Sequence, residues 1–182
     1  MRITEQLMKG ATDLYQLAFL ITGSGELAAE LAADAIASER ALRLRHLHVT
    51  LWTPRLLVIE EALAAVADEF VTSARRTVTN QPDLSDLPPA NWKLDPDTTP
   101  TDLERALLDI DVFPRCAIVL TVFEGLPVDA AAFLMNTNAN LVRTGVAFAS
   151  AELTRRLAEM QGWVRDAAPV QRHPFLGKLR YA

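Results

Sequence analysis

The sequence has 182 residues, of which 50% are hydrophobic and 23% charged, and its formal net charge is −5. This length holds one or two small domains, and the composition excludes a disordered chain. The acidic balance argues against strong non-specific binding to nucleic acid, and the abundance of Ala and Leu over aromatic residues favours helices.

Two amphipathic helices are predicted in the first 45 residues. Apolar residues recur at steps of three and four from Leu7 to Ile21, and a second stripe runs from Leu27 to Leu42. The glycines around Ser24 predict that the first helix ends there and that Ser24 caps the second.

The next segment reads as a loop, a helix and then a linker. Residues 46–52 are predicted to be a loop or a helix end, although they include β-branched and aromatic side chains. A third helix is expected from Thr53-Pro54, where Thr suits the N-cap and Pro the first helical position, to about Phe70. From Thr77 to Thr101 five prolines stand among polar residues, which predicts a linker.

The second half carries the outline of a helix-turn-helix. Thr101 and Glu104 have the spacing of a capping box, so a helix is predicted from there to about Asp109. An apolar helix is then expected from Pro114 to Phe123, with Glu124-Gly125 as its end.

Pro127 is predicted to open a short helix, which is followed by a turn at residues 136–138 and a longer helix from about Ala139. Two helices joined by such a turn are typical of DNA-binding proteins.

The predicted fold is therefore all-α, with two small helical domains joined by a Pro-rich linker. The predicted boundaries are residues 1–76 for the first domain, 77–100 for the linker, 101–162 for the domain with the helix-turn-helix, and 163–182 for a basic tail. The tail has a net charge of +3, which leaves −8 on the preceding residues. A solubilising or loosely docked end is the simplest reading of such a tail.

Residues that carry catalysis or bind metals are sparse. His46 and His48 do not share one helix face, His173 is remote from them in sequence, and Cys116 lies in an apolar run where a core role is expected. We therefore predict no metal, no cofactor and no enzymatic activity. The sequence also shows no signal peptide and no membrane span, so a cytoplasmic protein is expected.

Two motifs carry a resemblance to a known family. Residues 21–37, ITGSGELAAELAADAIA, are similar to the second-region segment L-T-G-D-x-x-D-A-E-D-L-V-Q-E-T-F of extracytoplasmic-function sigma factors. Glu30 and Asp34 fall where the family has acids. Residues 115–126 resemble the fourth-region opening R-x-V-x-x-L-R-x-x-E-G-L, with matches at Arg115 and at Glu124-Gly125-Leu126.

The resemblance implies a transcription regulator whose first domain binds RNA polymerase core, with Glu30 and Asp34 in contact with the polymerase. Its second domain would read promoter DNA with the second helix of the helix-turn-helix. The implied DNA-binding residues are Asn138, Asn140, Arg143, Thr144, Arg155 and Arg156.

The recognition helix departs from the family in charge. Arg143 stands at the family's lysine, but Gly145 and Phe148 stand where two arginines normally face DNA. DNA binding is therefore expected to be weak or lost, because fewer phosphates are neutralised. For the promoter melting that the resemblance implies, Trp52 is the one candidate aromatic residue.

The sequence is compatible with two functions. One is a sigma-factor-like regulator that contacts polymerase core and promoter DNA. The alternative is a degenerate relative without DNA readout that acts through contacts with a regulatory protein partner.

Overall fold

The computed structural model describes residues 2–44, 53–80 and 87–163. All regular secondary structure in these ranges is helical, which confirms the prediction of an all-α fold. The loop or helix end predicted at 46–52, including Trp52, and nearly all of the basic tail lie outside the described residues.

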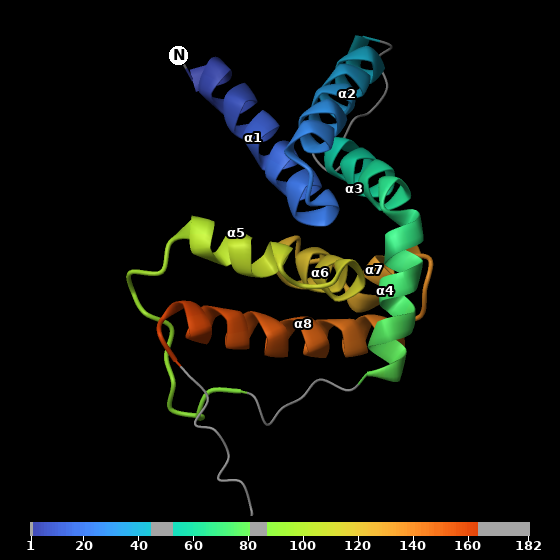
Figure 1. The fold of residues 1–182 in the computed structure, drawn as a ribbon. Coiled ribbons are helices and arrows are strands. Elements are labelled where there is room, and N and C mark those ends of the chain that lie inside the picture. The colour runs from blue at the N-terminus through green and yellow to red at the C-terminus, as the bar shows by residue number, and fades with distance from the viewer. Residues whose placement is uncertain (1, 45–52, 81–86, 164–182) are drawn as a thin grey trace, which may run out of the picture.

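The first three helices pack against one another at one end of the molecule (Figure 1). They are α1 (Arg2–Thr22), α2 (Gly25–Leu44) and α3 (Thr53–Ala65). The predicted cap between α1 and α2 is confirmed, since the Leu27 amide donates to Ser24 Oγ at 3.3 Å. Gly23 has a φ of 72°, a left-handed conformation that suits glycine at a helix end.

The chain then turns at Val66 and forms α4 (Ala67–Thr79), so the prediction that helix ends near Phe70 is wrong. The first three residues of the predicted linker, 77–79, are part of this helix. Thr77 is buried and its hydroxyl donates to the Ser73 carbonyl at 3.0 Å, so it is satisfied within its own helix.

Helix α5 (Pro100–Leu108) begins slightly earlier than predicted, because its capping box is formed by Thr99 and Asp102 and not by Thr101 and Glu104. The Asp102 amide donates to Thr99 Oγ1 at 3.2 Å, and the Thr99 amide donates to Asp102 Oδ2 at 3.0 Å. Pro100 then takes the first helical position, where a missing N–H costs nothing.

The remaining helices follow the prediction closely. Helix α6 (Val112–Ile118) continues into η2 (Val119–Phe123), a π-helical turn that is followed by its C-cap Glu124 and by Gly125, whose φ is 68°. Helices α7 (Val128–Leu134) and α8 (Ala139–Met160) flank the predicted turn.

Figure 1 shows α8 lying along α5 and α6, while α4 crosses near the N-terminal end of α8. One cluster of buried residues joins the two halves of the chain. It contains Leu17 and Ile59 from the first half together with Phe113 and Val142 from the second. The boundaries at 76 and 101 stay a prediction, but the two halves share a core in this structure.

Arg115 on α6 is buried, with only 6% of its surface exposed. Its Nη1 donates to the carbonyls of Leu108 at 3.0 Å and Ile110 at 3.2 Å, and its Nη2 donates to the carbonyl of Ile21 at 3.2 Å. Ile21 and Leu108 lie at the C-terminal ends of α1 and α5, where unpaired carbonyls attract a cation. Burial lowers the pKa of Arg115, but a guanidinium stays charged at neutral pH.

Replacing Arg115 with Met should lower the free energy of unfolding by about 2–4 kcal/mol, because three carbonyls lose a charged donor. Urea denaturation measures the change. Arg75→Met, at an exposed position on α4, is the control and should change stability by less than about 0.5 kcal/mol. Equal effects of the two substitutions would contradict the role given to Arg115.

Helices α6 and α8 approach closely at Gly145. A Cβ at Gly145 would lie 2.8 Å from Cε1 of Phe113 and 3.1 Å from Cβ of Ala117. The Phe113 ring is fully buried and packs edge-on against Phe70, so it has little room to move.

We expect Gly145→Ala to destabilise the fold by about 1 kcal/mol or more, because overpacking outweighs the better helix propensity of Ala. Gly10→Ala is the matched control, since no atom lies within 4 Å of its Cβ position on α1. That change should stabilise by about 0.5–1 kcal/mol. Thermal unfolding of both variants checks the opposite signs, and a stabilised Gly145→Ala would overturn the packing argument.

Candidate functional site

The start of α8 presents four of the predicted DNA-binding residues to solvent. Asn138 caps the helix, with its Oδ1 accepting from the Leu141 amide at 2.9 Å. Asn140, Arg143 and Thr144 follow at helical steps of three and four, and all are exposed. The structure therefore brings these four residues together on one accessible end of α8.

The charge on this face is small. Arg143 Nη1 donates to Asn140 Oδ1 at 2.9 Å, and the Thr144 hydroxyl donates to the Asn140 carbonyl at 3.1 Å. Arg143 has no carboxylate partner among the described residues, so its charge is available to an anion. One cation supplies only a weak attraction for a phosphate backbone.

The other two predicted DNA-binding residues are not part of this face. Arg155 and Arg156 lie twelve and thirteen positions beyond Arg143, about 18 Å along the helix. Arg155 pairs with both Glu152 and Glu159, and the hydrogen bond to Glu152 is the main cause that raises its pKa.

Arg156 lies 3.8 Å from a carboxylate oxygen of Asp109 and 3.9 Å from one of Glu152. Both arginines thus lie beside carboxylates of this chain, and these negative charges weaken the attraction of the arginines for phosphate.

Position 145 faces the interior and not DNA. The resemblance places a DNA-facing arginine there, but Gly145 is buried against Phe113, and a side chain at this position would clash. Phe148 is half-buried on the same helix. The missing charge at 145 is therefore a packing requirement of this fold, which the sequence comparison did not reveal.

Helix α2 offers a different kind of surface. Glu30 and Asp34, the predicted polymerase contacts, are both exposed one turn apart, and neither pairs with a described residue. Glu26, one turn before Glu30, is also exposed and extends the row. Beside this acidic row runs an exposed row of small residues, Ala29, Ala33 and Ala37. The opposite side of α2 is buried through Ala28, Ala32 and Ala35.

The segment 115–126, which resembles a fourth-region opening, contributes a cross-link between the halves. Glu124 accepts from Arg55 Nε at 2.8 Å and from Arg55 Nη2 at 2.9 Å, a two-point pairing. The Glu124 side chain is 8% exposed and that of Arg55 is 33% exposed. Arg55 lies on α3, so the pair joins the first half of the chain to the end of η2.

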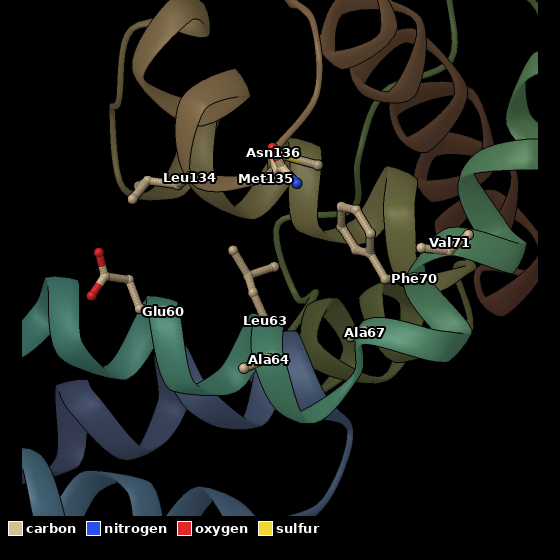
Figure 2. A pocket seen from close by; sticks show the side chains of 9 residues that line it. All are labelled: Glu60, Leu63, Ala64, Ala67, Phe70, Val71, Leu134, Met135 and Asn136. Atoms are coloured by element: carbon tan, nitrogen blue, oxygen red, sulfur yellow. The ribbon is translucent and has the colours of Figure 1, made fainter.

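A cleft of about 320 Å³ lies between α3–α4 and α7 (Figure 2). Its lining is mostly apolar, and it contains no histidine, cysteine or cation. Across the described ranges, no three side chains of His, Cys, Asp or Glu gather as a metal site. None of the helices described is both long and apolar enough to cross a membrane.

Comparisons with known proteins found no match to this chain among family models, curated proteins or solved structures. The resemblance to sigma factors therefore stays a prediction from the residues. Sequence reasoning missed three cross-links, which are made by Arg55, by Arg115 and by Ser73, whose hydroxyl accepts from the Phe113 amide. The signal for Arg115 was present, because an arginine inside the apolar run from Val112 to Leu120 must find acceptors when buried.

The Arg55–Glu124 pair should show a coupling energy of about 1 kcal/mol in a double-mutant cycle. Its two-point geometry and the burial of Glu124 favour coupling, and the partly exposed Arg55 limits it. Urea unfolding of Arg55→Gln, Glu124→Gln and the double variant measures it. Strictly additive single effects would show that the pair does not hold the two halves together.

Proposed function

We propose that this protein is a sigma-factor-like regulator that acts through protein contacts on the exposed face of α2, with RNA polymerase core as the expected partner. The single observation that carries this proposal is the unpaired acidic row of Glu30 and Asp34 beside a row of alanines. The carboxylates attract a basic partner, and the small side chains allow a helix to approach closely.

The charge on α8 supports the same choice. The face at its start has Arg143 as its cation, and Arg155 and Arg156 lie beside carboxylates. A protein held on DNA by phosphate contacts needs several free cations on one face. Protein contact through α2 therefore ranks above independent DNA readout through α8.

Promoter reading remains the second function, and one observation favours it. Asn138, Asn140, Arg143 and Thr144 share one exposed end of α8, and such residues bind phosphates and base edges. In this second function α8 adds a weak contact to DNA that polymerase already holds.

Reversing the charge of the α2 face tests the first function. Glu30→Lys/Asp34→Lys should weaken capture of purified RNA polymerase core by more than about tenfold, because like charges replace opposite ones. The control is Glu61→Lys/Asp97→Lys, which makes the same charge change at exposed residues elsewhere. Binding is followed by pull-down and by a titration with labelled protein. Equal retention of core by both variants would refute the proposed surface.

A promoter-fragment titration tests the second function. Fluorescence anisotropy at low salt, with and without polymerase core, should show little binding by the protein alone. If α8 does bind DNA, Arg143→Ala should remove it and lower the slope of log affinity against log salt by about 1. Tight, salt-sensitive binding without core would reverse the ranking of the two functions.

A further inference from the structure

Helix α4 (Figure 1) carries an exposed stripe on the side opposite to the core. The members of this stripe recur at steps of three, four and three residues, so they share one face of the helix, and they are Asp68, Val71, Arg75 and Val78. The buried residues Ser73 and Thr77 lie on the other side of the helix. The stripe therefore faces away from the rest of the chain.

The two apolar members of the stripe are open to water. Val71 is 49% exposed and Val78 is 67% exposed, large fractions for apolar side chains. Val71 also lines the cleft between α3–α4 and α7, together with Ala67 and Phe70 of the same helix (Figure 2). The apolar part of the stripe thus continues into the cleft, and joined apolar surface of this kind marks a site of protein contact.

The two charged members of the stripe have opposite signs. Asp68 and Arg75 are both exposed, and no described residue forms an ion pair with either of them. They stand seven positions apart, about 10 Å along the helix, which is too far for them to pair with each other. A partner that fits the stripe should bring a cation to Asp68, an anion to Arg75 and an apolar contact between them.

A second copy of α4 meets these requirements when the two helices run antiparallel. A two-fold axis beside Val71 places this side chain against its own copy. Asp68, three positions before Val71, then lies near Arg75 of the second copy, and the symmetric pair forms on the other side of the axis. Val78 of each chain reaches the mouth of the other chain's cleft, at the level of Ala64.

The charges also determine the direction of the pairing. Two parallel copies of α4 in register would place Asp68 against Asp68 and Arg75 against Arg75. Like charges repel in that arrangement, whereas the antiparallel one pairs opposite charges twice.

We propose that this protein forms an antiparallel two-fold dimer through the exposed stripe of α4, with Val71 beside the axis and Asp68 paired with Arg75 of the second copy. The inference does not rest on the proposed function, because the stripe of α4 and the exposed face of α2 belong to different helices.

The dimer is expected to be weak. One helix stripe and the mouth of a cleft make a small interface, and its ion pairs are exposed to solvent, so a dissociation constant of about 10–100 µM is expected. Protein at about 1 µM is then monomeric, and Arg75 remains a neutral position in unfolding experiments at that dilution.

Sedimentation of the full-length protein measures the association. The weight-average mass should rise from the chain mass of 20.0 kDa at about 1 µM toward twice that value at about 300 µM. A mass that stays at one chain over this range would rule out the dimer and assign the stripe to a different protein.

A charge swap tests the pairing across the axis. Asp68→Arg and Arg75→Asp should each weaken the dimer by about tenfold or more, because like charges then meet at two places. The double variant should restore association to within about threefold of the native value, since both pairs form again with their signs exchanged. Such restoration also excludes misfolding of the single variants. The controls, Asp97→Arg and Lys93→Asp, make the same charge changes at exposed positions outside the stripe and should leave association unchanged.

Cross-linking tests the antiparallel direction. A short bismaleimide should join Val71→Cys to its copy, because position 71 lies beside the axis. Val78→Cys is the matched control on the same stripe, and its two copies stand fourteen helical positions apart, about 21 Å, so they should stay unjoined. The native Cys116 is fully buried and does not compete for the reagent.

Three further results would overturn the proposal. A double variant as weak as the single variants contradicts the pairing of Asp68 with Arg75. Equal cross-linking at positions 71 and 78 excludes an antiparallel arrangement. A dimer that ignores every change on α4 assigns the association to another surface of the chain.

Discussion

The buried guanidinium of Arg115 is the constraint on which the arrangement of the two halves depends. It satisfies carbonyls at the ends of α1 and α5 at once, and those helices come from opposite sides of the sequence linker. An apolar side chain cannot supply these donors, and a lysine ammonium cannot present a planar fork toward two directions. With this junction fixed, the Ser73 hydroxyl can accept from the Phe113 amide at 2.9 Å and cap α6 from across the interface.

The same interface gives a structural role to the segment that resembles sigma factors, residues 115–126. Arg115 and Glu124 are two of the matched positions, and in this chain both bind groups of the first half. Gly125, a third match, ends the helix with a positive φ. Structural contacts and backbone conformation account for these three residues, so this motif by itself gives no support to DNA binding. The proposed role rests instead on the acidic row of α2, which is exposed and which packing does not require.

Much of the fold followed from local sequence signals. Helix periodicity and cap residues predicted α1, α2, α7 and α8 well, because each signal acts within a few residues. The wrong secondary-structure predictions lie where contacts between distant parts of the chain, or a neighbouring proline, determine the structure. The sequence predicts a linker from Thr77, yet Thr77 and the neighbouring Ser73 are buried on α4, which the second half covers. Thr101 and Glu104 had a capping spacing, but Pro100 favours the earlier start with Thr99 as cap.

The candidate site could be predicted in part for the same reason. Exposure of Glu30, Asp34 and Arg143 follows from helix faces, which periodicity reveals. The pairing of Arg156 with Asp109 brings α8 and α5 together, and no local pattern encodes such a contact. Gly145 reads in isolation as a lost DNA contact, whereas its neighbour Phe113 lies 32 positions away in sequence.

A shared core also limits how this protein can meet a partner. In the arrangement that the resemblance implies, two separate domains contact polymerase core and promoter DNA. Here, separation would expose Phe113 and Leu17 and would break the contacts of Arg115 and Glu124. Both effects oppose the separation, because exposing apolar side chains to water and breaking hydrogen bonds to a charged group each cost free energy. Binding through one outer face, such as that of α2, leaves the core intact and so carries no such cost.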